Sequence, residues 1–353
     1  MNNAVLVTGA SGFLGRHCLP LLVEAGFDVH ALSRRPERTS TPGIRRHAVD
    51  LLRPGSAAEV MSHIRPQYLL HLAWYAVPGK FWEARENLEW LRASLELLLA
   101  FAGGGGERLV AAGSCAEYDW NDADNRSGGE CSEAATPLLP GTLYGSSKHA
   151  LERVLHHSRR QTGVSSAWGR IFFLYGVGEQ PERLVAYAVH SLLQGEPAHC
   201  SEGRQVRDFL HVTDAAAAFV ALLRSEVEGP VNIASGIPVS IRQILEQIGQ
   251  ETGRPGLLRY GARDSSLNNP GSRASSLNHG RTEPARLWAN VRRLKEEVGF
   301  SPQYDLAAGI RQTVEWWRRS LDRDPVAAAV AESDVAESNL VESAATEPAV
   351  TES

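Results

Sequence analysis

The sequence predicts an α/β fold built on a doubly wound parallel sheet, and two features near its start support this. Residues 4–7 are a short apolar, β-branched run, as expected for a strand buried on both faces of a parallel sheet. This run leads into a turn with three glycines and then into an apolar helical stretch that reaches residue 25. A strand, a glycine-rich turn and a helix in this order form the first unit of a dinucleotide-binding sheet. The 353 residues suffice for two packed domains or one large α/β domain.

The composition is that of a soluble globular protein, with 43% hydrophobic and 22% charged residues. The net charge of −5 is unevenly distributed, because the chain from Asp324 onward carries seven acids and no Lys or Arg. The first 323 residues carry 36 bases against 34 acids. This near balance gives no reason to expect a nucleic acid or an anionic membrane as partner.

Several other classes of protein are not expected. The four cysteines contain no CxxC pair and the twelve histidines no HExxH spacing, so neither a metal site nor a disulfide framework is predicted. The longest apolar run, residues 215–223, is too short to span a bilayer. No signal peptide precedes the first strand, and we expect a cytoplasmic protein.

The glycine turn has the spacing GxxGxxG, with Gly9, Gly12 and Gly15. One glycine allows the tight turn, one lets the backbone approach phosphates, and one lets helix and strand pack closely. The pattern alone would also fit a purely structural turn, but its position between a strand and a helix favours nucleotide binding. The candidate cofactor-binding residues here are Gly9, Ser11, Gly12, Phe13, Leu14 and Gly15.

A second strand, residues 28–32, completes the first βαβ unit and bears on the choice of cofactor. Enzymes that prefer NAD place an acid at the end of this strand to bind the ribose hydroxyls. Here Ser33 is followed by Arg34 and Arg35, whose guanidinium groups can pair with a 2′-phosphate. The sequence therefore favours NADP as the cofactor. The alternative is that Arg34 and Arg35 are solvated loop residues that do not contact a cofactor.

The next strands supply further candidate cofactor contacts. Asp50 and Leu51 follow a short strand at residues 46–49, and Asp50 could approach the adenine or simply cap the loop. Residues 68–73 form another buried strand, whose end at Leu72 and Ala73 should lie beside the cofactor. An amphipathic helix over 86–102, a run of four glycines and a strand over 108–112 follow.

The candidate catalytic residues come after that strand. Ser114 follows it directly, and Tyr144 and Lys148 open a later helix. Tyr and Lys four residues apart lie on one helical face. An ammonium near a phenol favours the phenolate, so we expect a lowered Tyr144 pKa and proton exchange with a substrate alcohol or ketone.

These motifs, taken in order, resemble the extended short-chain dehydrogenase/reductase family, in its nucleotide-sugar epimerase/dehydratase/reductase branch. The resemblance rests on the glycine turn, the HLA strand end, Ser114 four residues before Tyr118, the YxxxK pair and the RDFLHV stretch from residue 207. It covers residues 4–317 and implies a Rossmann-type sheet with a smaller, interleaved C-terminal substrate domain.

The resemblance also implies roles for matching residues. Tyr144 would be the acid/base, Lys148 would hold the nicotinamide ribose and tune the tyrosine, and Ser114 would hydrogen-bond the reacting oxygen. Arg207 would meet the phosphates of a nucleotide-linked substrate; the alternative is a surface arginine paired with Asp208.

Departures from the family pattern narrow the reaction. Dehydratases of this branch place an Asp-Glu pair directly after the Ser/Thr, where this chain has Cys115 and Ala116, so 4,6-dehydration is not expected. Glu117 lies one position too late to substitute, and Cys115 reads as a small buried thiol. Phe173 stands where several epimerases have an asparagine that contacts substrate phosphate.

The remaining chain is expected to be organised as follows. Residues 1–170 form mainly the cofactor domain and 171–321 mainly the substrate domain, with a segment around 205–235 returning to the first. We expect a mobile loop over 261–283 and a disordered acidic tail over 322–353. Trp74, Trp82 and Trp120 either line the sugar pocket or pack in the core. By analogy with the family, a homodimer would form through the helices over 86–102 and 148–161.

The function predicted first is NADP-dependent reduction of a keto group on a nucleotide-linked deoxysugar. The alternative is an NAD-dependent nucleotide-sugar 4-epimerase, which uses the same three catalytic groups. A non-catalytic nucleotide-binding module is the third hypothesis, and it leaves the Ser/Tyr/Lys set unexplained.

Overall fold

A computed structural model describes residues 3–35, 41–120, 129–261 and 284–323. Of the loop predicted over 261–283, all but residue 261 lies outside this range, and so does the tail predicted over 322–353 from residue 324 onward. Residues 322 and 323 belong to a helix instead. In the described part no helix is long and apolar enough to cross a membrane, and no group of three or more His, Cys, Asp or Glu side chains could hold a metal.

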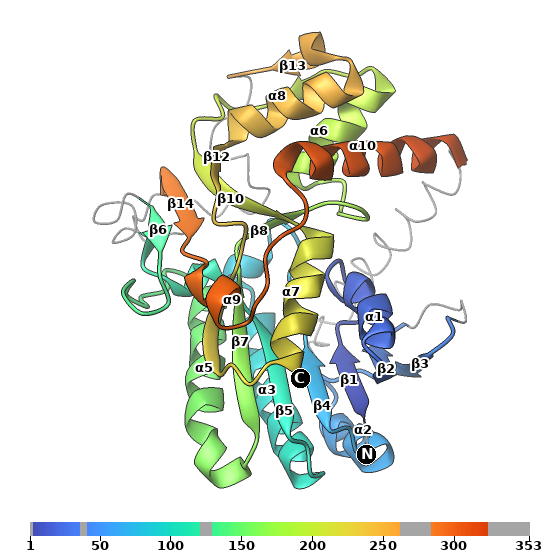
Figure 1. The fold of residues 1–353 in the computed structure, drawn as a ribbon, viewed down its shortest axis with the longest axis vertical. Coiled ribbons are helices and arrows are strands. Elements are labelled where there is room, and N and C mark those ends of the chain that lie inside the picture. Colours follow the sequence, from blue (N-terminus) through green and yellow to red (C-terminus); the bar gives the residue numbers. More distant parts are fainter. Residues whose placement is uncertain (1–2, 36–40, 121–128, 262–283, 324–353) are drawn as a thin grey trace, which may run out of the picture.

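A seven-stranded sheet forms the larger half of the protein (Figure 1), and every neighbouring pair of its strands is parallel. Its spatial order is β11-β7-β5-β4-β1-β2-β3. The β3-β2-β1-β4-β5 part of this order is that of a dinucleotide-binding doubly wound sheet, so the predicted fold class is confirmed. The strands are β1 (Ala4–Thr8), β2 (Asp28–Ser33), β3 (Ile44–Ala48), β4 (Tyr68–His71), β5 (Arg108–Ser114), β7 (Ser165–Ile171) and β11 (Gly229–Ile233).

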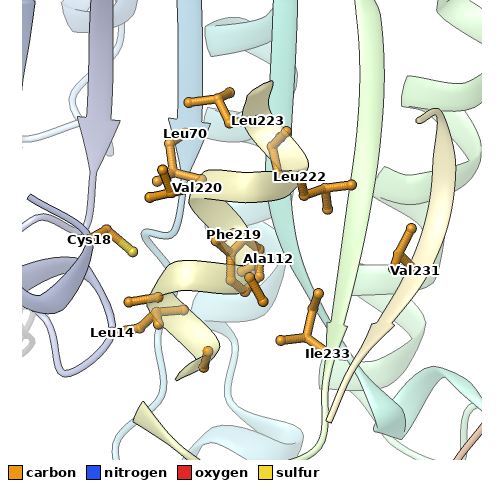
Figure 2. Close-up of a cluster of buried hydrophobic side chains, with 14 of the residues drawn as sticks. Leu14, Cys18, Leu70, Ala112, Phe219, Val220, Leu222, Leu223, Val231 and Ile233 are labelled. Atoms are coloured by element: carbon orange, nitrogen blue, oxygen red, sulfur yellow. The ribbon is translucent and has the colours of Figure 1, made fainter. Parts of the chain in front are cut away.

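Helices cover both faces of this sheet. On one face α1 (Gly15–Glu24) packs against α7 (Val212–Arg224). On the other face α3 (Glu86–Gly103) packs between α2 (Ser56–Ile64) and α5 (Leu143–Thr162). Figure 2 shows the first contact, where the apolar side of α7 meets α1 and the strands with Leu14, Cys18, Leu70, Ala112, Phe219, Val220, Leu222, Leu223 and Ile233.

A second, smaller sheet lies beyond the ends of the large-sheet strands and gathers distant parts of the chain. Its central strand β10 pairs antiparallel with β12 and parallel with β14 and β8, and β14 pairs with β6. These strands are β6 (Glu130–Cys131), β8 (Phe173–Tyr175), β10 (Val206–His211), β12 (Pro238–Ser240) and β14 (Arg286–Ala289).

Three helices pack together on the far side of this small sheet around a separate buried core (Figure 1). They are α6 (Leu184–Gln194), α8 (Ile241–Thr252) and α10 (Leu306–Arg323). The short β9 (Ala198–His199) and β13 (Leu258–Arg259) pair beside them, and α9 (Arg292–Glu296) is a further short helix.

The chain crosses between the two sheets several times. β6 lies before residue 170 but pairs with β14, whereas α7 and β11 lie after it and pack with the large sheet. Within the segment 205–235, β10 belongs to the small sheet and only α7 and β11 return. The division into two domains at residue 170 stays a prediction.

Candidate active site

The glycine turn between β1 and α1 is packed so tightly that two of its positions need glycine. Gly9 has φ +67, and a Cβ there would come within 2.7 Å of the backbone N of Ala73. A Cβ on Gly15 would lie 2.1 Å from the Gly9 carbonyl oxygen. The Gly12 N–H closes the turn on that same oxygen at 3.0 Å. The turn thus brings the start of α1 and Leu72–Ala73 to one place, a cradle whose backbone and helix N-terminus fit a pyrophosphate.

A chain of buried hydrogen bonds fixes the end of β4 beside this turn. The Ala73 N–H donates to the Thr8 hydroxyl at 3.2 Å, and that hydroxyl lies 2.7 Å from Nδ1 of His71. Nε2 of His71 lies 2.8 Å from the Ser94 hydroxyl, which itself donates to the Trp90 carbonyl. Because Ser94 uses its proton on Trp90, His71 donates from Nε2 and accepts at Nδ1. Burial, together with the nearby Lys148 charge, lowers the His71 pKa to about 3, so this ring is neutral near pH 7.

The predicted adenosine-side residues lie at the same edge of the sheet. Ser33 ends β2, and the side chains of Arg34 and Arg35 after it are exposed. The Ala10 N–H donates to the carbonyl of Leu32, the residue before Ser33, at 3.3 Å, and this bond joins the end of β2 to the glycine turn. The Asp50 carboxylate accepts from the Leu52 N–H at 3.0 Å, the loop-capping arrangement left open above.

Ser114, Tyr144 and Lys148, distant in the sequence, are brought together at the next strand end. Ser114 is the last residue of β5, and Tyr144 and Lys148 lie in the first turns of α5. The Ser114 side chain lies close to the Tyr144 phenol, and their interaction lowers the pKa of Tyr144. The Lys148 ammonium donates to the Ala112 carbonyl at 2.8 Å. This helix starts where it does because the Thr142 hydroxyl caps it, accepting from the Gly145 N–H at 3.1 Å.

The expected lowering of the Tyr144 pKa is not what the structure gives. Burial raises the pKa of Tyr144 above its usual value, and the interaction with Ser114 offsets only part of this rise. Burial also lowers the pKa of Lys148 to about 7, because the ammonium is removed from water. Desolvation therefore outweighs the attraction that the spacing of the two residues suggested.

Aromatic side chains surround these catalytic candidates. The Lys148 ammonium lies 3.8 Å from the centre of the Trp74 ring, a cation–π contact. The Tyr144 ring packs edge-on against Phe81 and Trp82, with ring centroids 4.8 and 5.9 Å apart. Trp82 in turn packs on Trp120. Trp82 and Trp120 are half-buried, so they combine packing with an exposed surface beside Tyr144.

The residues after Ser114 occupy a short 3₁₀ turn and are buried. Cys115 is 6% exposed, and burial raises its pKa to about 12, so the thiol is inert. Glu117 is fully buried and accepts hydrogen bonds from the Ser114 backbone, Trp168 and Arg170. A carboxylate held in this way is not placed to protonate a substrate, which agrees with the expectation that it does not substitute for the dehydratase pair.

Arg207 is buried on β10, so the alternative of a surface arginine is wrong. Its guanidinium donates to the Val206 carbonyl at 2.8 Å and lies 5.6 Å from the Phe173 ring centre. The neighbouring Asp208 accepts from the Ser235 hydroxyl at 2.6 Å and from backbone N–H groups. The Arg207 charge also lowers the pKa of the Cys115 thiol, which places Arg207 near the Ser114 end of β5.

Residues 5–234 match a family model described as the NAD dependent epimerase/dehydratase family. The chain belongs to this family. The matched segment makes up well over half of the sequence, and it includes the glycine turn, Ser114, Tyr144, Lys148 and Arg207.

Relatives within this epimerase/dehydratase family carry out more than one reaction. The chain is 25% identical to a UDP-glucose 4-epimerase of Rhizobium meliloti, across 90% of this chain and 98% of the relative. It is also 25% identical to UDP-glucuronic acid decarboxylase 1 of Xenopus tropicalis, across 90% of this chain and 73% of the relative. Among solved structures, MoeE5 in complex with UDP-glucose and NAD is 30% identical, with a TM-score of 0.73 over 90% of this chain and 99% of that one.

Several residues at the site carried no signal in the sequence that reasoning from spacing could use. The folded chain brings Trp74 into contact with Lys148 and Glu117 into contact with Ser114. Neither Trp74 nor Glu117 belongs to a motif with a defined spacing. Thr8 and His71 lie inside the recognised motifs, but their hydrogen bond joins strands 63 residues apart.

Proposed function

We propose that this protein is a nucleotide-sugar 4-epimerase that uses NAD and acts on a UDP-linked hexose. The observation that carries the proposal is that Ser114, at the end of β5, meets Tyr144 and Lys148, one helical turn apart on α5, at the strand edge that holds the glycine turn. The names of the relatives support the substrate class and favour 4-epimerisation over ketoreduction.

The residues divide the work as follows. The tight turn at Gly9 and Gly15 holds the pyrophosphate of the dinucleotide, and Lys148 binds the ribose next to the nicotinamide. NAD held in this way would supply reversible hydride transfer at the sugar C4, so that this carbon could be oxidised and then reduced on its other face. Tyr144 has to be deprotonated to take the proton of the C4 hydroxyl as the C–H bond breaks. Its buried phenol favours the protonated form, so the positive charges of the nicotinamide and of the Lys148 ammonium would have to favour the phenolate. Tyr144 gives the proton back when the alcohol reforms, so protons and electrons balance.

Ser114 and Arg207 hold the substrate during this exchange. The Ser114 hydroxyl donates to the oxygen on C4 and limits the charge that builds up there. Arg207 is a buried cation near the Ser114 end of the site, and it pairs with the diphosphate of the sugar nucleotide. A pair of phosphates bound at this point leaves the sugar to extend toward Tyr144 and the Trp82 ring.

A second candidate function is the NADP-dependent reduction of a 4-keto sugar nucleotide. One observation favours it, the exposed Arg34 and Arg35 after Ser33 where an NAD enzyme would have an acid. The same Ser/Tyr/Lys set would then protonate the new alcohol once, with one NADPH consumed for each sugar.

Product analysis separates the two. The purified protein is incubated with UDP-glucose without added reductant, and in parallel with a 4-keto-6-deoxy sugar nucleotide and NADPH. In the first incubation we expect conversion of UDP-glucose to UDP-galactose, and in the second we expect the NADPH absorbance to stay constant. Stoichiometric loss of NADPH without interconversion would instead establish the reductase. Tyr144→Phe should abolish either turnover and retain cofactor binding, and full activity in this variant would reject both mechanisms, because each uses Tyr144 as the acid/base.

We also propose that the protein forms a homodimer through α3 and α5. These two helices pack side by side, and three large apolar side chains on them are exposed, Leu88 (52%), Leu99 (66%) and Val154 (43%). Light scattering should give twice the chain mass for the wild type and a lower mass for Leu99→Glu. A monomeric wild type would refute this arrangement.

A further inference from the structure

We propose that Glu117 is a positioning residue of this active site, which fixes the backbone of Ser114 and sets the local charge around Tyr144 and Lys148. The proposal rests on the proposed function in taking Ser114, Tyr144 and Lys148 as the reacting groups. Glu117 itself touches none of the substrate-facing atoms, since its side chain is fully buried.

The first step of the argument is the contact with Ser114. Oε1 of Glu117 accepts the Ser114 backbone N–H at 2.7 Å, while the Ser114 hydroxyl accepts the Ala116 N–H at 3.2 Å. Together these bonds form a capping box over the 3₁₀ turn at Cys115–Glu117. Because the Ser114 hydroxyl is the acceptor in the bond from the Ala116 N–H, its own proton stays available for the Tyr144 oxygen or a substrate oxygen. Backbone and side chain of Ser114 are thus both oriented by this one turn.

The second step is that Glu117 is itself held rigidly from the neighbouring strand. Trp168 on β7 donates its indole N–H to both carboxylate oxygens, at 2.9 and 3.0 Å. Arg170, also on β7 and fully buried, donates from Nε at 2.9 Å. Gly113 makes the approach possible, because a Cβ there would lie 2.0 Å from the indole nitrogen. A carboxylate with this many donors has one available position.

The third step extends the network to the small sheet. The Arg170 guanidinium also bonds the Tyr118 hydroxyl at 3.2 Å, and that hydroxyl donates to Oδ1 of Asn232 at 2.7 Å. The Asn232 amide then donates to the carbonyls of Cys131 and Asn290 at 3.0 Å. The position of Ser114 is therefore tied through Glu117 to β6 and to the residue after β14, which lie on the substrate side.

The fourth step concerns charge. The titratable groups that feel the charge of Glu117 are Arg170 on β7, Cys115 in the same 3₁₀ turn, and Tyr144 and Lys148 on α5. The negative charge of Glu117 raises the pKa of both Tyr144 and Lys148, because it opposes the phenolate and favours the ammonium. Glu117 is the charged side chain whose attraction for the Lys148 ammonium partly opposes the effect of burial on the Lys148 pKa.

Two substitutions separate the two roles. Glu117→Asp keeps the charge beside Arg170 but shortens the side chain, so the carboxylate no longer reaches both Ser114 and β7. We expect kcat to fall by about 100-fold with the pH limits of the rate unchanged, the usual effect of a small misplacement at a reacting centre. Glu117→Gln keeps the shape of the side chain but removes its charge, and we expect the apparent pKa values in the pH profile of kcat to move to lower pH.

The matched control is Glu152→Gln. Glu152 is a buried carboxylate on α5, one turn beyond Lys148, and it contacts His149 and not Ser114. This variant should keep both kcat and its pH limits. Circular dichroism checks the fold of every variant. Because Glu117→Gln leaves Arg170 without its counter-charge and can fail to fold, Glu117→Asp alone is sufficient to test the positioning role.

A readout without turnover keeps this test distinct from that of the proposed function. The chain has three lysines, Lys80, Lys148 and Lys295, so an NMR titration of proteins labelled at the lysine side chains resolves Lys148 directly. Its pKa should be lower in Glu117→Gln than in the wild type and unchanged in Glu152→Gln. An inactive wild type that shows this shift would refute the proposed function alone. An unshifted Lys148, or a Glu117→Asp variant within twofold of the wild-type kcat, would overturn the role of Glu117.

Discussion

The burial of Lys148 makes the catalytic site a source of instability, which can be tested by replacing this residue. Its pKa lies at about 7, against 10.5 for an exposed lysine. One pKa unit is worth about 1.4 kcal/mol, so the folded protein bears a cost of ~5 kcal/mol at neutral pH to keep an ionisable amine there. Lys148→Met has a similar length and no charge. It should therefore be more stable than the wild type near pH 7, by up to this amount, and catalytically inactive.

The sign and pH dependence follow from proton binding. Between pH 7 and 10.5 the unfolded chain binds the Lys148 proton and the folded chain does not, so wild-type stability rises with pH in this window. The stability gap between Lys148→Met and the wild type should narrow by about 1.4 kcal/mol per pH unit over this window. Below pH 7 the gap should be constant.

Urea unfolding of both proteins at a series of pH values, after removal of any bound dinucleotide, measures this gap. The slopes of the unfolding curves with urea should agree between the two proteins. A Lys148→Met variant less stable than the wild type at every pH would refute the reasoning, and so would a gap without a pH slope. Either result would mean that the Ala112 carbonyl and the Trp74 ring fully compensate the desolvation of the ammonium.

Three further predictions concern binding. Gly15→Ala places a Cβ 2.1 Å from the Gly9 carbonyl oxygen, so the dinucleotide affinity measured by calorimetry should fall at least about 100-fold, or the protein should not fold. Gly256→Ala is the control, because a Cβ there meets nothing within 4 Å, and its dinucleotide affinity should match that of the wild type. Arg207→Lys keeps the charge but loses the paired donors, and we expect a KM for the sugar nucleotide raised by about tenfold with kcat little changed; an unchanged KM would exclude a phosphate contact. Replacing both Arg34 and Arg35 by Ala should leave NAD binding intact and weaken NADP binding, and equal losses for both would show that the arginines do not read the 2′-phosphate.

The parts of the fold that the sequence predicted well are those set by local spacing. The glycine turn needs short-range backbone geometry at Gly9 and Gly15, and the YxxxK pair needs only one helical turn, so both can be inferred from neighbouring letters. The parallel sheet followed from apolar runs that are continuous rather than alternating, as in residues 4–7. The fold class and the family were therefore predictable without coordinates.

What could not be predicted depends on contacts between distant residues. Burial around Tyr144 comes from Phe81 and Trp82, about sixty positions earlier, and it reverses the direction of the pKa shift that the lysine spacing suggested. Glu117 was recognised only as a residue out of place, since its partners Trp168 and Arg170 lie on a strand some fifty residues later. The choice of epimerisation over ketoreduction rested on relatives rather than on any single residue.

The pairing of β6 with β14 has a consequence for the biosynthesis of the protein. The strand β6 has no partner until β14 has been synthesised, more than 150 positions later. Until then the Asn232 amide also lacks the Asn290 carbonyl to which it donates. A fragment cut at residue 234, where the family match ends, would keep β10 but lose both β12 and β14 beside it. Nascent chains of that length should be retained by chaperones and degraded readily by proteases, and only the addition of the residues after 234, which complete the small sheet, should make them resistant.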